Sequence, residues 1–325
     1  MGIDLSEMIL AAALAAVTPA GSVQTEIEAP GPAGPLRGTI MAPASDSRAV
    51  VLIIPGSGAI DRDGNSSMGV SAAPYRLLAE GLAERGIATV RIDKRGLRGS
   101  AGAVPDANAV SISGYAADVH QWVSVARAST GAPCIWLLGH SEGGLVSLLA
   151  GQEPEGICGL VLVAATGRPI GTVIREQLRA NPANAPLLDQ AMAAIDSLEA
   201  GRRFDVGGMH PALMPLFAPQ LQDYQIDIMS YDPAELIAAV ERPVLIVHGQ
   251  RDLQVGEVDA RRLAGANPGA RLTLIADANH VLKSTPDDRA ANIATYGDPS
   301  LPLAPGIVDA IADFVAPPSD AGPAE

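Results

Sequence analysis

Apolar runs and helical patterns alternate along most of this chain. Residues 49–54, AVVLII, are continuously apolar, as expected of a strand buried on both faces of a parallel sheet. Similar runs predict strands at residues 88–92, 135–138, 160–165, 244–247 and 272–275, and residues 23–29 and 37–42, separated by a Pro/Gly turn, predict a hairpin. Helical patterns lie between them, at residues 75–85, 115–128, 145–150, 258–264 and 307–315. The alternation is typical of right-handed βαβ units, so we expect an α/β domain with a mostly parallel central sheet flanked by helices.

The alternation is interrupted between residues 167 and 241. No buried-strand run occurs in this segment, and its helical stretches, at residues 173–179 and 187–200, are separated by prolines. We therefore predict one core domain, residues 23–166 and 242–325, with a helical cap of residues 167–241 inserted after the sixth strand.

Residues 1–22 precede the first strand and form an N-terminal helix or a signal-like segment. Residues 9–17 are apolar and residues 18–20 resemble a cleavage site, but Asp4 and Glu7 stand where a signal peptide carries positive charge. A leading helix is therefore favoured. It predicts a cytoplasmic protein, with a periplasmic or secreted location as the alternative. The apolar run is too short to span a bilayer.

The composition narrows the classes of partner. The formal net charge is −14, and Lys94 and Lys283 are the only lysines. Because clusters of Lys and Arg are absent, we expect no nucleic acid partner. The acidity also disfavours binding to an anionic membrane. We expect a small-molecule substrate and leave the oligomeric state, monomer or homodimer, open.

Cys134 and Cys158 are the only cysteines, and each begins a predicted core strand. Two reduced, apolar side chains are the favoured interpretation. A disulfide between neighbouring strands is the alternative. Neither cysteine has a metal-ligand partner at a suitable spacing, so this pair predicts no metal site.

The strongest chemical signal is GHSEG at residues 139–143, between a predicted strand and a predicted helix. This is the G-x-S-x-G pattern in the context of a nucleophile elbow, and it predicts the α/β-hydrolase fold. The glycines allow neighbouring chain to pass close to a strained serine. Ser141 is the candidate nucleophile. The N–H of Glu142, at the start of a helix, is a candidate oxyanion donor.

Chain order then selects the acid and the base, because in this fold Asp or Glu follows the serine and His comes last. Asp252 lies in the loop after the strand at residues 244–247, and His280 in the loop after the strand at residues 272–275. Asp277 and Glu257 remain rivals of Asp252. Position excludes the other histidines, which are His120, His140, His210 and His248.

The loop after residues 49–54 reads PGSG, and we choose the N–H of Ser57 within it as the second oxyanion donor. This loop continues into DRDGN at residues 61–65, which invites a calcium interpretation. An EF-hand would need glycine and glutamate where Ser66 and Ala72 stand, so we predict no metal. We expect instead an Asx-rich loop with internal ion pairs that positions Ser57.

These motifs resemble a bacterial serine-esterase family marked by a GSG-x-x-DRDGN loop. Further matches are DKRG at residues 93–96, GHSEGG at 139–144, HPALMPLF at 210–217, RDLQV at 251–255, NHVLK at 279–283 and YGDPSLPL at 296–303. The resemblance implies short-chain carboxylesterase activity, a helical cap over the site, the same three catalytic residues and no cofactor. One departure follows DKRG, where the glycine stands at Gly99 rather than at position 98.

The leading hypothesis is therefore a serine carboxylesterase that hydrolyses short-chain, fairly apolar esters through an acyl-enzyme. An amidase, peptidase or thioesterase could use the same residues, and a non-catalytic binding protein on this fold is a third possibility. The apolar side chains of the cap either line an acyl pocket or form the core of the cap itself. They are Met209, Leu213, Met214, Leu216, Phe217, Tyr224 and Met229.

Overall fold

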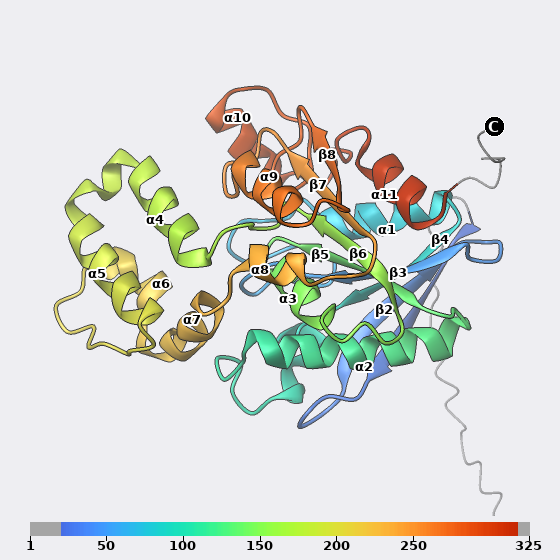
Figure 1. The fold of residues 1–325 in the computed structure, drawn as a ribbon, viewed down its shortest axis with the longest axis horizontal. Coiled ribbons are helices and arrows are strands. Elements are labelled where there is room, and N and C mark those ends of the chain that lie inside the picture. Colours follow the sequence, from blue (N-terminus) through green and yellow to red (C-terminus); the bar gives the residue numbers. More distant parts are fainter. Residues whose placement is uncertain (1–20, 318–325) are drawn as a thin grey trace, which may run out of the picture.

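An eight-stranded sheet forms the centre of the computed structural model, which describes residues 21–317 (Figure 1). Nearly all of the predicted segment 1–22 therefore lies outside the described residues. The strands are β1 (Val23–Ala29), β2 (Leu36–Ala42), β3 (Ala49–Ile54), β4 (Ile87–Ile92), β5 (Ile135–His140), β6 (Ile157–Val163), β7 (Val244–Gly249) and β8 (Arg271–Ile275). They lie in the order β1-β2-β4-β3-β5-β6-β7-β8.

Pairing within the sheet is mostly parallel. β2 is antiparallel to both β1 and β4, whereas every pair from β4 to β8 is parallel. The inner parallel strands, such as β3, β4 and β7, are buried almost throughout, because helices cover both faces, whereas the edge strand β8 is only partly buried. The predicted α/β-hydrolase fold with a mostly parallel sheet is confirmed.

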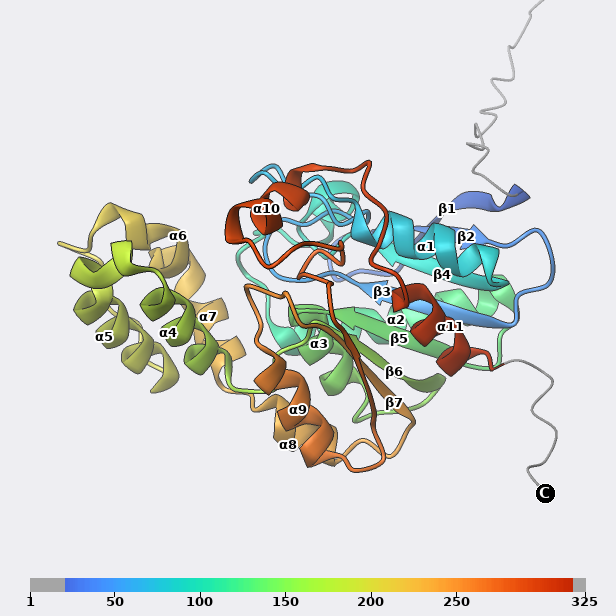
Figure 2. The same ribbon diagram turned by 90° about the horizontal axis from the view of Figure 1, so that it is seen from above.

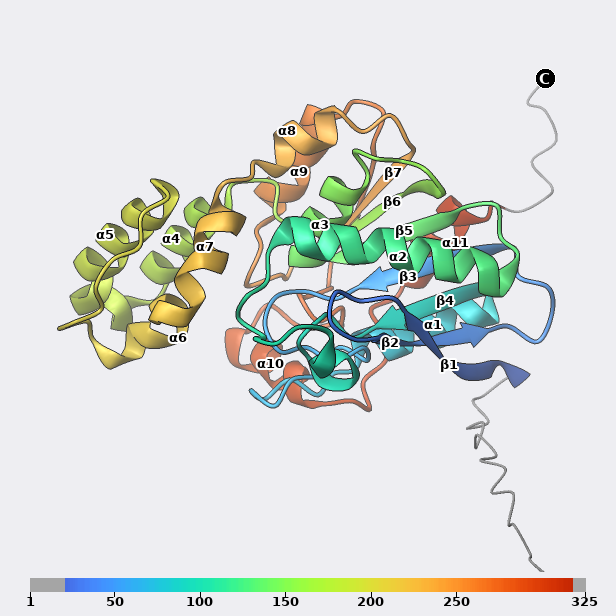
Figure 3. The same cartoon turned by 90° about the horizontal axis from the view of Figure 1, so that it is seen from below.

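The two faces of the sheet carry different helices. α1 (Pro74–Glu84) and α11 (Ile307–Val315) pack on one face, seen from above in Figure 2. α2 (Ile112–Thr130), α3 (Glu142–Ala150) and α9 (Glu257–Ala266) pack on the other, with α2 and α3 in front in Figure 3. Local sequence sets the ends of α2, because Ser111 Oγ accepts from the Gly114 N–H and Gly131 closes the helix at a φ of 73°.

The segment between β6 and β7 is helical and stands to one side of the sheet (Figure 2). It contains α4 (Ile170–Ala180), α5 (Leu188–Glu199), α6 (Met214–Phe217) and α7 (Gln222–Met229). α8 (Pro233–Ala238) leads back to the core, where it contacts α3 and α9. A helical cap after the sixth strand is thus present, as predicted.

The predicted strands and long helices are all present, with ends that differ by a few residues. Several short helices were not predicted, because each is only one or two turns long and carries little periodicity. Besides α6, α7 and α8, these are α10 (Arg289–Ala294) and the 3₁₀ turns Arg98–Ala103, Pro182–Leu187, Pro211–Leu213, Pro219–Leu221 and Thr295–Gly297.

The expectation of two reduced cysteines is wrong. Cys134 and Cys158 form a disulfide, with Cα atoms 5.2 Å apart. The reason is the pairing of β5 with β6, in which Ile135 lies opposite Ile157. This pairing brings the two cysteines to adjacent positions at the amino ends of neighbouring strands, within the range that a disulfide spans. The strand register that decides this is not visible in the sequence.

Within residues 21–317, no helix has the length and apolar character needed to cross a membrane.

Candidate active site

Ser141 occupies a sharp turn between β5 and α3. Its backbone has a φ of 54° and a ψ of −119°, in the left-handed half of conformational space that is strained for a non-glycine residue. The flanking glycines are sterically required. A Cβ at Gly139 would lie 2.1 Å from the carbonyl oxygen of Gly143, and a Cβ at Gly143 would lie 2.2 Å from that of Ile54. The sequence GHSEG therefore forms this turn only with glycine at both positions.

Asp252 and His280 meet at the carboxyl ends of β7 and β8. His280 Nδ1 lies 2.8 Å from Asp252 Oδ2, and both side chains are almost completely buried. Asp252 Oδ1 accepts from the N–H groups of Gln254 and Val255. Burial by itself raises the pKa of Asp252, but His280 and these two N–H groups outweigh it and hold the pKa below its usual value. The carboxylate therefore stays ionised beside the imidazole.

Buried side chains lock the loop that carries His280. Asn279 donates through Nδ2 to Asn292 and to Thr295, and its Oδ1 accepts from the N–H of Lys283. Asn292 in turn donates to the carbonyl oxygen of Arg251, next to Asp252. The acid loop and the base loop are thus joined by asparagine side chains as well as by the Asp252–His280 pair.

The two predicted oxyanion donors lie at the same cavity as Ser141. Ser57 and Glu142 both line it. Glu142 begins α3, where the first N–H groups of a helix have no intrahelical partner. The N–H of Gly56 is already used, because it donates to the hydroxyl of Tyr75 at 3.0 Å. Ser57, the next residue of this loop, lines the cavity and stays the candidate donor.

His140, next to Ser141, connects the elbow to the base loop. Its Nδ1 lies 2.9 Å from the Tyr75 hydroxyl and its Nε2 lies 2.8 Å from the carbonyl oxygen of His280. Burial and, secondly, the neighbouring His280 lower the pKa of His140 to about 3. The ring is therefore neutral. Among residues 21–317 no hydrogen bond from Ser141 Oγ to His280 is formed, and such contacts commonly tighten only when substrate binds.

The cavity at Ser141 has a volume of about 200 Å³. One wall comes from the core, including Leu145 and Val255, and the other comes from the cap. The cap contributes mainly apolar side chains, namely Ile170, Val173, Ile174, Leu216 and Ile228. A larger open groove of about 990 Å³ lies at the amino ends of the strands, and none of the predicted site residues lines it.

Some of the apolar cap residues named from the sequence line the pocket at Ser141, and others form the buried core of the cap. Leu216 and Tyr224 line the cavity. Leu213, Phe217 and Met229 belong instead to the buried core that the cap shares with the α2–α3 face. The pocket is thus lined by fewer of these residues than the composition of the cap suggested.

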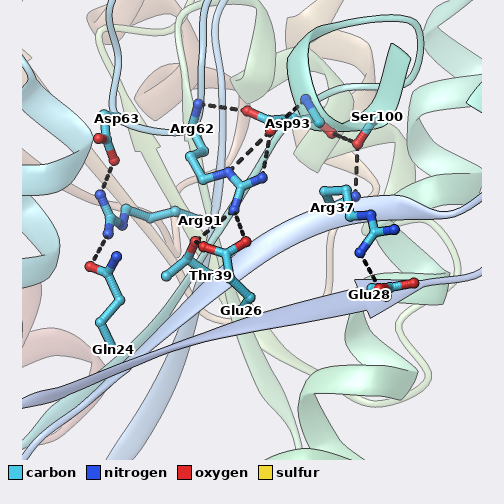
Figure 4. Close-up of polar contacts among 11 residues, drawn as sticks. Gln24, Glu26, Glu28, Arg37, Thr39, Arg62, Asp63, Arg91, Asp93 and Ser100 are labelled. Carbon is cyan, nitrogen blue, oxygen red and sulfur yellow. Dashed lines mark hydrogen bonds and ion pairs between the residues drawn. The ribbon is translucent and has the colours of Figure 1, made fainter. Parts of the chain in front are cut away.

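The ion pairs of the DRDGN stretch join it to the sheet and not to itself. Arg62 donates to both carboxylate oxygens of Asp93 and also to Glu26 and Thr39, while Asp63 pairs with Arg91 (Figure 4). The expected ion pairs inside the loop are therefore wrong. The contacts inside the loop are hydrogen bonds instead: Asp61 Oδ1 accepts from the N–H groups of Asp63 and Asn65, and backbone hydrogen bonds join Asp61 to Gly64 and Asn65. Strands β1, β2 and β4 supply the partners.

Sequence reasoning assigned no role to Tyr75, Lys94, His140, Asn279 or Asn292. Lys94 Nζ lies 2.9 Å from Glu142 Oε1 and 2.7 Å from the carbonyl oxygen of Gly56, and it is buried. Lys94, His140 and Asn279 lie within the motif stretches, and this position was the one sign in the sequence that they contribute to the site. What each contacts depends on the fold, so the sequence alone could not assign them.

Comparisons with known proteins find similar sequences and similar folds. A family profile described as "Serine aminopeptidase, S33" matches residues 65–196, which is less than half of the chain. Esterase EstD of Thermotoga maritima is 25% identical over 246 residues, which cover 73% of this chain and 56% of EstD. This chain therefore matches little more than half the length of that relative.

Solved structures share the fold. Est1E from Butyrivibrio proteoclasticus superposes with a TM-score of 0.53 at 19% identity, covering 83% of this chain and 94% of Est1E. Proline iminopeptidase from Mycobacterium smegmatis gives a TM-score of 0.56 at 14% identity, covering 79% and 92%. At such identities the likeness shows the fold alone. The chain therefore has the α/β-hydrolase fold.

Proposed function

We propose that the protein is a serine carboxylesterase that acts on short-chain, fairly apolar carboxylic esters. The observation that carries the proposal is the buried Asp252–His280 pair, whose imidazole lies against His140, the residue before a strained serine that opens onto a small, largely apolar cavity. In this assignment Ser141 is the nucleophile, His280 the general base and Asp252 the acid that orients it.

The reaction follows from these positions. Because Nδ1 of His280 is bound to Asp252, Nε2 is the nitrogen that can take the proton of Ser141. The serine oxygen attacks the ester carbonyl, and the N–H groups of Ser57 and Glu142 stabilise the oxyanion. His280 then gives the proton to the departing alcohol, which leaves an acyl-enzyme. Water, activated by the same histidine, releases the acid and restores Ser141.

A peptidase is the second candidate, because the matching profile is described as an aminopeptidase. An aminopeptidase must hold a protonated amino group, which calls for a carboxylate at the pocket. Glu142 is the one carboxylate among the residues that line the cavity in the described chain, and Lys94 already neutralises it. This lining favours an uncharged ester over a peptide with a free amino terminus.

The proposal is tested by hydrolysis of p-nitrophenyl acetate, butyrate and octanoate, and of matching p-nitroanilides, by wild type and by Ser141→Ala. We expect turnover of the short esters, little turnover of the anilides, and loss of nearly all activity in Ser141→Ala. Equal activity in the variant would remove Ser141 as nucleophile. Faster turnover of the anilides, above all those with a free amino group, would favour the peptidase.

The cellular location is a separate question. The cytoplasmic location remains a prediction, and the Cys134–Cys158 disulfide favours the alternative, since disulfides are typical of oxidising compartments. Mass spectrometry of alkylated protein, taken from cells without prior reduction, distinguishes the two. Unmodified cysteines would favour a periplasmic or secreted protein, and two alkylated cysteines a cytoplasmic one.

A further inference from the structure

The peptide between Gly56 and Ser57 is held by a buried lysine. Lys94 Nζ donates to the carbonyl oxygen of Gly56 at 2.7 Å. That carbonyl belongs to the same peptide group as the N–H of Ser57. Because a trans peptide is planar, with C=O and N–H pointing in opposite directions, fixing the oxygen also fixes the direction of the N–H. Lys94 therefore determines where the Ser57 N–H points.

The same lysine is bound to the residue that supplies the other donor. Its Nζ lies 2.9 Å from Glu142 Oε1, and about 4% of each side chain is exposed. Lys94 also lies over the ring of Tyr115, 5.0 Å from the ring centre. With its contacts on three sides, the ammonium group has a defined place between the loop of Ser57 and the start of α3.

The preceding peptide, between Pro55 and Gly56, is held by Tyr75. The N–H of Gly56 donates to the Tyr75 hydroxyl, so the single hydroxyl proton of Tyr75 is free to donate to His140 Nδ1. His140 must then carry its own proton on Nε2, which donates to the carbonyl oxygen of His280. The donor and the acceptor are thereby fixed in each of these three hydrogen bonds, which run from Gly56 through Tyr75 and His140 to His280.

Both anchors of Gly56 lead to neighbours of Ser141. One runs through Tyr75 to His140, and the other through Lys94 to Glu142. A buried ion pair is not by itself a reason for stability, because removing two charges from water is costly. A role in fixing two hydrogen-bond donors relative to the nucleophile accounts for the pair better than stability does.

We propose that Lys94 is a positioning residue of the esterase: it sets the Gly56–Ser57 peptide, and with Glu142 it fixes the spacing of the two oxyanion donors. The inference rests on the proposed function. A lysine ammonium on the carbonyl also polarises the peptide, which makes the Ser57 N–H a stronger donor. Lys94 acts through the peptide and does not itself touch the reacting atoms.

The test replaces the lysine without leaving a lone buried charge. Lys94→Met alone leaves Glu142 unpaired and can unfold, so the main variant is Lys94→Met combined with Glu142→Gln. Removal of one oxyanion donor lowers kcat by about 10²–10³-fold in a known case, so loss of its alignment should lower kcat by roughly 30–100-fold. KM should change by less than about threefold, because the donors act on the transition state.

Two further measurements separate positioning from stability. Binding of a trifluoromethyl ketone, which forms a tetrahedral adduct on the serine, should weaken by the same factor as kcat. Arg95→Met combined with Asp118→Asn is the matched control, because Arg95 also pairs with a buried carboxylate, that of Asp118, and also donates to a carbonyl oxygen, that of Gly114. We expect this control to lower Tm while kcat stays within about threefold of wild type.

The outcomes are distinct. A kcat of the double variant within threefold of wild type, with wild type active, overturns the role of Lys94 and leaves the proposed function standing. An equal loss of kcat in the Arg95→Met, Asp118→Asn control, or losses of kcat that follow the loss of Tm in both double variants, also overturns it. If wild type hydrolyses no ester, the proposed function fails, and the inference fails with it. Tyr75→Phe gives a second check, with an expected loss of roughly tenfold in kcat from the other anchor.

Discussion

The loops around Ser141 and the cap that faces them are held together in different ways. The loops are joined by buried, directed hydrogen bonds, such as Asp252–His280 and Lys94–Gly56. The cap is held by apolar packing and by ion pairs at its surface, such as Arg175–Glu199. Hydrogen bonds fix atoms in direction and distance, whereas apolar packing tolerates changes of shape. We therefore assign the chemistry to the loops and the choice of substrate to the cap.

The largest expected effect removes the charge that orients the base. In Asp252→Asn the shape is retained, but the imidazolium that forms during the reaction loses its carboxylate, so kcat should fall by about 10⁴-fold. Asp277→Asn is the matched control, since Asp277 is exposed and was the rival acid in the sequence. Steady-state kinetics on p-nitrophenyl butyrate decide between them. A loss in Asp277→Asn instead would move the acid to that residue.

The core could be predicted from sequence further than the cap could. GHSEG, Asp252 and His280 lie where motif and chain order placed them, because a strained elbow and the ends of buried strands leave strong sequence signals. The catalytic roles themselves stay proposals. The sequence does not show which cap residues face the cavity. Leu216 lines it, whereas Leu213 lies in the buried core. Side-chain direction on short helices depends on packing between segments far apart in the chain.

Contacts made through strand register were likewise beyond the sequence. The disulfide depends on how β5 lies beside β6, and the partners of Arg62 and Asp63 lie on strands β1, β2 and β4 (Figure 4). Local composition suggested only that the DRDGN loop would be internally bonded. Long-range pairing decides these contacts, and a single sequence does not reveal it.

Removal of the disulfide tests whether the amino ends of β5 and β6 affect the catalytic loops at the opposite end of the sheet. Replacing Cys134 and Cys158 by serine removes a crosslink of sequence separation 24, which should lower the free energy of unfolding by about 3 kcal/mol in the chain-entropy account. The Tm should fall by roughly 4–5 °C. Activity at 25 °C should persist, because the pair lies at the amino end of β5 and Ser141 follows its carboxyl end. A large loss of kcat at 25 °C would show that the two ends are coupled.

A smaller effect is the loss of folding stability at low pH that the buried, neutral His140 causes. The unfolded His140 binds a proton below a pH of about 6.5, but the folded pKa is lowered to about 3. Between these values the unfolded state binds more protons, so stability falls as pH decreases from 6.5 towards 3. The contribution between pH 6.5 and 5 is about 2 kcal/mol.

His140→Asn should therefore show a flatter decline of Tm with decreasing pH than wild type does. His248, whose pKa burial also lowers, contributes in the same direction and remains in the variant. Thermal melts at pH 7, 6 and 5 measure the slopes. Parallel slopes for wild type and His140→Asn would contradict the burial of a neutral ring at this position.

The smallest expected effect lies in the cap. Ile174→Phe narrows the cavity, so kcat/KM for p-nitrophenyl octanoate should fall about tenfold, a change of about 1.4 kcal/mol, while that for the acetate stays within about twofold. Ile226→Phe is the matched control, because Ile226 lies in the cap but does not line the cavity. Equal losses on both esters would show that the cap contributes to the chemistry, and would contradict its assignment to substrate choice alone.

The central claim, that Ser141 carries the acyl group, is tested most directly by trapping the serine. Wild type is treated with diethyl p-nitrophenyl phosphate, digested, and mapped by mass spectrometry, with Ser141→Ala treated alike. The account predicts one diethylphosphoryl group per chain, on Ser141, with matching release of p-nitrophenol and loss of ester hydrolysis. Labelling of another residue that abolishes hydrolysis, or full hydrolysis by a chain labelled on Ser141, would contradict it.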